Sequence, residues 1–124
     1  MGDSSPIRAL IGRAISLPAP LLASYPDLAS VQWRRGGLPV YIGGWCLGQR
    51  SVAAITLWRV VFLAADTPLD PELLLHELRH AYQFQASAAF PLLYLWESVH
   101  RGYVDNRYEA DARSYAARRL QGAN

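Results

Sequence analysis

The sequence predicts an α+β fold, in which a small antiparallel sheet packs on a central helix and two further helices follow at the C-terminal end. Three observations predict it. Residues 51–63 are rich in β-branched and aromatic side chains, which favour strands. Residues 70–86 open with a helix-start signal and continue as an apolar helix. Two later segments, 90–100 and 106–120, are also typical of helices. We expect one domain over residues 1–124, because a chain of this length can bury a single core.

Residues 1–30 are interpreted as a Pro-rich N-terminal arm. A short helix is expected over residues 6–15, and turns are expected at Pro18, Pro20 and Pro26.

The small sheet is expected within residues 38–64. Two glycine pairs flank a short extended segment, residues 38–42, and a second extended run covers residues 51–63. We expect these two segments to pair as antiparallel strands.

The central helix is predicted from Pro71 to about residue 84 or 86. Asp70 suits the N-cap, proline is favoured at the first helical position, and Glu72 complements the positive end of the helix dipole. Apolar side chains cover most of its circumference, which indicates a helix buried in the middle of the domain: Leu74, Leu75, Leu78, Ala81 and Tyr82.

The two later helices complete a helical part that we expect over residues 70–120. The first should end near Gly102, which suits the residue after a helix, and the second should begin at Asn106. In the first of them the aromatic side chains are expected to lie in the core rather than in a substrate pocket: Phe90, Tyr94 and Trp96.

The central helix carries the pattern His-Glu-x-x-His at residues 76–80. Residues four apart lie one turn apart on a helix face, so His76 and His80 can bind one metal ion. Glu77 stands where its carboxylate could take a proton from a metal-activated water. Two histidines and a glutamate on a buried helix would be costly without partners, and a metal ion supplies one. The pattern therefore predicts a zinc site.

A catalytic zinc ion normally has a third protein ligand. The downstream candidates are Glu97, His100, Asp105, Glu109 and Asp111. Glu109 is our choice because its helix phase matches Ala112, Ala116 and Leu120, an apolar stripe that should face inward. Asp111 lies about 200° around the helix and is expected to be exposed. Asp105 and then His100 are the reserve ligands.

Glu109 also has an interpretation that needs no metal. With Asn106 as N-cap, Glu109 is the fourth residue of a capping box, in which its carboxylate would bond the Asn106 backbone N–H. Two other residues in or near the motif are not assigned to the metal site. Gln83 could support a histidine or lie on the helix surface, and Arg79 is expected on a solvated face.

Taken in order, the two segments resemble the gluzincin clan of zinc metallopeptidases, and more narrowly its compact bacterial minigluzincin-like domains. The first segment is His-Glu-Leu-Arg-His-Ala-Tyr-Gln at residues 76–83, and the second is Asn-x-x-Glu-x-x-Ala at residues 106–112. The similarity covers roughly residues 50–120. Larger gluzincins carry an acidic residue one turn after the ligand Glu, where this chain has Arg113.

The resemblance implies a peptide-bond hydrolase with one Zn²⁺ per chain, bound by His76, His80 and Glu109. It implies that Glu77 acts as general base and acid. An oxyanion donor is also needed. Tyr103 is the first choice because it lies in a loop leading to the ligand helix, with Tyr108 and His100 as alternatives. The preceding strand could bind an extended peptide substrate by edge pairing.

Composition narrows the function classes. The net charge is only +2, and the twelve basic residues, all arginines, form no continuous stripe, so nucleic acid is not an expected partner. No segment reaches 18 uninterrupted apolar residues, which argues against a transmembrane helix, and no signal peptide is convincing. A cytoplasmic location is the default expectation. Cys46 is the only cysteine and excludes an intrachain disulfide and a Cys-rich zinc site.

Four other interpretations remain open. The zinc could stabilise a non-catalytic interaction or regulatory domain, or residues 1–30 could cover the cleft of a latent protease. The chain could be a metal-free helical adaptor. Two histidines and a carboxylate also suit Fe(II). The substrate, the oligomeric state and the pathway are not predicted.

Overall fold

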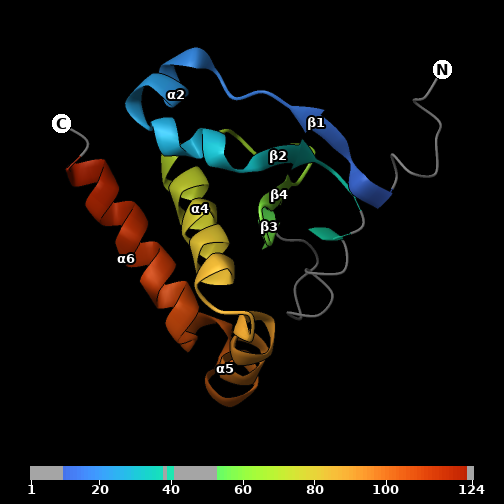
Figure 1. Ribbon diagram of the computed structural model, residues 1–124, viewed down its shortest axis with the longest axis vertical. Helices are drawn as coiled ribbons and strands as arrows, with labels where there is room; N and C mark the ends of the chain where they lie inside the picture. Colours follow the sequence, from blue (N-terminus) through green and yellow to red (C-terminus); the bar gives the residue numbers. More distant parts are fainter. Residues whose placement is uncertain (1–9, 38, 41–52, 123–124) are drawn as a thin grey trace.

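The computed structural model describes residues 10–37, 39–40 and 53–122, which form a four-stranded mixed sheet and three long helices (Figure 1). The strands are β1 (Arg13–Ile15), β2 (Gln32–Arg35), β3 (Ala54–Leu57) and β4 (Val60–Leu63). The long helices are α4 (Pro71–Ala86), α5 (Phe90–Asp105) and α6 (Arg107–Gln121). The short helices α2 (Ala19–Ser24) and η2 (Pro26–Ser30) lie between β1 and β2.

The α+β class is confirmed, as is the packing of a small sheet on the helix that carries the His-Glu-x-x-His pattern, with two further helices after it. The strand order is β1-β2-β4-β3. The outer pairs are antiparallel, but β2 and β4 run parallel, so the sheet is mixed rather than wholly antiparallel.

Three details of the sheet differ from expectation. Residues 51–63 were expected as one strand, whereas β3 and β4 form a hairpin, because Trp58 adopts a positive φ of 56° and turns the chain. Of the expected extended segment 38–42 only Pro39 and Val40 are described, and these two are helical. Its place in the sheet is taken by β2.

The N-terminal arm is part of the fold. Of the expected helix over residues 6–15, the first four residues lie outside the described part, residues 10–11 are helical, and Arg13–Ile15 is a strand instead. Gly12 makes this change of direction possible, since its φ is +65° and a Cβ there would lie 2.2 Å from the Arg35 carbonyl oxygen. Leu28, in η2, is fully buried.

Helix α4 is the centre of the core. The predicted start is confirmed, because the Asp70 side chain accepts a hydrogen bond from the Leu73 N–H and Pro71 is the first helical residue. One side of α4 packs against the sheet and the arm, and α6 lies alongside α4 (Figure 1). The core joins all of these elements: Leu17, Tyr25, Leu28, Val31, Trp33, Val61, Leu63, Leu74, Leu75, Leu78, Ala81 and Ala116.

The later helices begin and end close to the predicted residues. Gly102, with φ 78°, interrupts α5 where its end was expected, and α6 starts directly after Asn106. Phe90 is buried as expected. Trp96, however, is 60% exposed, so the prediction of a core position is wrong for this residue. It lies on an outward face of α5 that neither α4 nor α6 covers.

Candidate metal centre

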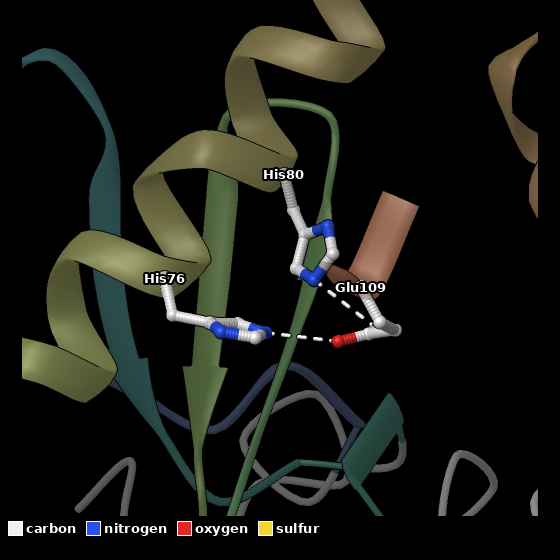
Figure 2. A group of neighbouring side chains, drawn as sticks. All are labelled: His76, His80 and Glu109. Carbon is white, nitrogen blue, oxygen red and sulfur yellow. Dashed lines mark hydrogen bonds and ion pairs between the residues drawn. The ribbon is translucent and has the colours of Figure 1, made fainter. Parts of the chain in front are cut away.

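His76 and His80 project from α4 toward Glu109 on α6 (Figure 2). His76 Nε2 lies 2.9 Å from Glu109 Oε1, and His80 Nε2 lies 3.2 Å from Glu109 Oε2. One ligand atom from each residue falls within 4.8 Å of the other two. Ligand atoms around a tetrahedral zinc ion stand about 3.3 Å apart, given bonds of about 2.0–2.1 Å. The three residues could therefore hold a metal ion with little rearrangement.

The contacts of Glu109 show that its carboxylate does not cap α6. The Asn106 side chain caps α6 by accepting from the backbone N–H groups of Tyr108 and Glu109. The reciprocal bond of a capping box is not made, because the Asn106 N–H donates to the Tyr103 carbonyl and the Glu109 carboxylate bonds the histidines. The inward phase predicted for Glu109 is borne out, since the residue is 3% exposed.

The electrostatics of the cluster suit a metal ligand set. Burial would raise the pKa of the Glu109 carboxyl, but hydrogen bonds from His76 and His80 and the charge of His80 hold it well below its usual range. Burial would lower the pKa of the His80 imidazole, whereas the hydrogen bond to Glu109 and the charges of Glu77 and Glu109 raise it to about 9. A metal ion entering at neutral pH would replace the His80 proton as the counter-charge of Glu109.

A fourth side chain, Tyr94 of α5, fixes the Glu109 carboxylate. Its hydroxyl donates to Glu109 Oε2, and its ring meets that of His80 edge-on at 6.0 Å. Burial and the charge of Glu109 raise the pKa of the Tyr94 phenol, so the group stays a donor. The sequence predicts only a core position for Tyr94, because the packing of α5 on α6 cannot be derived from the local sequence.

Glu77 lies on the sheet side of the histidines. It is 6% exposed, and the Thr56 hydroxyl of β3 lies 2.9 Å from its Oε1 and 3.2 Å from its backbone carbonyl oxygen. Thr56 was not among the candidate residues. Its only signal was a polar side chain inside an apolar strand sequence.

A pocket of about 410 Å³ opens beside the cluster. His76 and Glu77 line it from α4, Tyr103 from the end of α5 and Arg113 from α6. Burial, together with the charges of Glu109 and Glu77, raises the pKa of the Tyr103 hydroxyl, which remains protonated and able to donate. Ala53 and Ala54, at the start of β3, form part of the wall. Arg113 was noted only as a departure from a family pattern, although its helical phase one turn after Glu109 could have placed it here.

The other two proposed oxyanion donors lie elsewhere. The Tyr108 ring packs edge-on against Phe90 at 4.9 Å, and His100 stacks on Trp96 and bonds its carbonyl oxygen. Neither lines the pocket. Tyr103 is the one of the three that does.

The reserve ligands are not in the cluster. His100 and Asp105 are exposed, and Glu97 pairs with Arg101 and Arg107. Asp111 was expected to be exposed, and its side chain is 39% exposed and accepts from Arg79 at 2.7 Å. Arg79 was expected on a solvated face, and its side chain is 34% exposed, with the guanidinium paired to that carboxylate.

No family model matches this chain, and no curated protein or solved structure matches it. Within the described ranges, no helix is both long and apolar enough to span a bilayer.

Proposed function

We propose that this protein is a zinc-dependent peptidase of the gluzincin type, with His76, His80 and Glu109 as zinc ligands. One observation carries the proposal: the three ligand atoms converge beside a pocket into which a second buried carboxylate, Glu77, also opens. A site that served only to hold metal would have no need of Glu77.

The number of ligands also supports a catalytic centre. Structural zinc is almost always bound by four protein side chains, whereas catalytic zinc keeps one position for water or substrate. Among the residues that the structure describes, the group has three members. The donor set of two imidazoles and one carboxylate is one that zinc accepts.

Bound zinc would supply Lewis acidity, polarising the scissile carbonyl and lowering the pKa of a water. Glu77 then accepts the proton of the attacking water at a carboxylate oxygen and passes it to the leaving amine. Thr56 holds one of those oxygens, Oε1, which leaves Oε2 free for the proton. Tyr103 donates its hydroxyl hydrogen bond to the developing oxyanion.

The position of β3 favours an extended peptide as substrate. Among the strands that the structure describes, β3 is an outer strand paired with β4, and its first residue Ala54 lines the pocket. Its outer edge could add a substrate segment as a further strand, with main-chain hydrogen bonds giving affinity.

A non-catalytic zinc-stabilised interaction domain is the second candidate. The outward face of α5 favours it, because four apolar side chains spaced along one side of the helix are each at least 60% exposed: Leu92, Leu95, Trp96 and Val99. The latent-protease alternative gains no such support. Tyr25 and Leu28 are buried in the core, and no residue of 10–30 lines the pocket.

The first experiment is elemental analysis of the wild type and three variants purified side by side. We expect about one zinc per chain in the wild type and in Glu77→Gln, and none in Glu109→Ala. Asp105→Ala, which removes an exposed carboxylate near the start of α6, is the matched control and should retain its zinc.

A peptide-library digest then separates the two candidates. Cleavage by the wild type that is lost in zinc-loaded Glu77→Gln supports the peptidase. Full zinc content without cleavage in either protein supports the interaction domain. A wild type that binds no zinc refutes both.

A further inference from the structure

A chain of hydrogen bonds leads away from His80 on the side opposite the ligand cluster. His80 Nδ1 lies 2.7 Å from Gln83 Oε1, on the same helix. The Gln83 amide nitrogen donates to the Tyr108 carbonyl oxygen at 3.1 Å and to Asp111 Oδ2 at 2.9 Å. The Arg79 guanidinium donates to the same Asp111 oxygen at 2.7 Å. These hydrogen bonds thus join α4 to the first two turns of α6.

The donors and acceptors in this chain permit one arrangement. A backbone carbonyl and a carboxylate can only accept, so the Gln83 amide must direct its NH₂ toward Tyr108 and Asp111. Its carbonyl oxygen then faces His80 and can only accept. His80 must therefore carry a proton on Nδ1, which leaves Nε2 as the atom that faces Glu109 and can bind a metal ion.

We propose that Gln83 is a positioning residue of the metal centre: held by Asp111 and Arg79, it fixes the tautomer and ring orientation of His80. The inference rests on the proposed metal site for its purpose, but the hydrogen bond itself exists whether or not the protein hydrolyses peptides. An outer partner of this kind is what a metal-bound histidine requires.

Two features make the support rigid. Arg79 is itself held, since its guanidinium lies over the Tyr115 ring at 5.0 Å from the centroid. The Tyr108 carbonyl belongs to the residue immediately before Glu109, so Gln83 ties the placement of one ligand to that of another. Arg113 cannot take this role, because it has no acceptor for a histidine and bonds the Val104 carbonyl.

The test compares Gln83→Met with Gln85→Met, an exposed glutamine of the same helix that bonds Arg59. Zinc affinity is measured by competition with a chromophoric chelator. Loss of an outer partner typically costs 10–100-fold in metal affinity, so we expect a fall of about that size for Gln83→Met and no more than about twofold for Gln85→Met. Zinc stoichiometry should stay at one in both.

A second readout follows the proton itself. In long-range ¹H–¹⁵N spectra the wild-type His80 should be protonated at Nδ1, and that proton should exchange slowly with water. Gln83→Met should accelerate the exchange. In Gln83→Glu the new carboxylate still accepts from His80 but repels Asp111. The double variant Gln83→Glu/Asp111→Asn restores a donor between these positions and should recover most of the lost affinity.

Three results would overturn the proposal: a His80 proton on Nε2 rather than Nδ1 in the zinc-loaded protein, unchanged zinc affinity in Gln83→Met, or unchanged proton exchange in that variant. Failure of the proposed function looks different. If the wild type binds zinc but cleaves nothing, both readouts still apply. If it binds no zinc, the exchange rate of the Nδ1 proton in the metal-free protein still tests whether His80 and Gln83 form the hydrogen bond.

Discussion

Replacing Thr56 by valine should destabilise the protein by more than the loss of a typical buried hydroxyl does. The substitution keeps the shape of the side chain and suits a strand, so neither a cavity nor strand propensity enters the comparison. What is removed is a hydroxyl that lies 2.9 Å from the Glu77 carboxylate oxygen Oε1 and 3.2 Å from the Glu77 backbone carbonyl oxygen. Both side chains are 6% exposed, so water cannot easily replace it.

The magnitude follows from the kind of acceptor. A hydrogen bond to a charged group contributes about 1.5–3 kcal/mol, against about 0.5–1.5 kcal/mol for a neutral pair. Thr67 is the matched control, because it is 7% exposed and its hydroxyl donates to the neutral Ala53 carbonyl oxygen at 3.0 Å. We therefore expect Thr56→Val to lose about 1 kcal/mol more than Thr67→Val.

Urea denaturation of the metal-free proteins at pH 7 measures both losses, and a double-mutant cycle with Glu77→Gln isolates the pair. Slopes for small proteins are about 1–3 kcal/mol per molar urea, so a difference of 1 kcal/mol is well resolved. A cycle that is additive to within about 0.5 kcal/mol would refute the reasoning, since residues that interact should couple. It would mean that Glu77 is not held by Thr56.

Three further predictions concern the metal, a turn and a helix contact. The apparent zinc affinity should rise about tenfold between pH 7 and 8 and less steeply toward pH 9, because the pKa of His80 is about 9 in the metal-free protein and its proton must leave. A flat profile in a chelator competition would contradict this. Gly12→Ala should lower the free energy of unfolding by more than the roughly 1–2 kcal/mol that a left-handed alanine costs, because its Cβ would also collide with a carbonyl oxygen. The control is Gly36→Ala, where φ is +74° but nothing lies within 4 Å of the new Cβ, and it should cost only that amount. Thermal unfolding of the two variants measures the difference. Arg119→Gln breaks a two-bond contact to an aspartate of η2 and should cost about 0.5–1 kcal/mol in urea denaturation, while exposed Arg118→Gln should be neutral; equal losses would remove any role for the contact.

Helix α4 shows how far local signals reach. Three successive residues, Asp70, Pro71 and Glu72, predict its start, and the Asp70 side chain accepts the hydrogen bond that the pattern predicts. The same holds for Asn106 at α6 and for the interruption at Gly102. Each of these features depends on atoms within a few residues of one another, so the sequence carries them directly.

The sheet depends on distant atoms and was predicted less well. β2 was missed because its partner β4 lies 28 residues further along the chain and runs parallel, so no hairpin signal marks it. The turn at Trp58 was missed because the pattern of such turns calls for glycine or asparagine. The Trp58 side chain is 62% exposed, and its ring lies 5.1 Å from that of Phe84 in α4.

The candidate site divides in the same way. The facing pair His76 and His80 follows from helix geometry alone, and the inward phase of Glu109 follows from its apolar neighbours. The roles of Tyr94 and Gln83 could not be derived, because they depend on how three helices approach one another. The helical phase of a residue gives the direction of its side chain, but not which groups of the neighbouring helices it contacts.

The distribution of buried polar groups connects these observations. Within the described part of the chain, six polar or charged residues are buried, and five of them lie at or beside the candidate site: Thr56, Glu77, His80, Asn106 and Glu109. Thr56 bonds Glu77, Glu109 pairs with His80, and Asn106 caps the helix that carries Glu109. Each of the five has a hydrogen-bond partner, and the ionic pair of His80 and Glu109 carries a desolvation cost that apolar residues of similar size would avoid. A fold that needed only stability would gain by replacing that pair. The gathering of these buried polar residues beside a pocket is instead what a metal centre requires, because the ligands must be oriented and able to lose their protons when the metal binds.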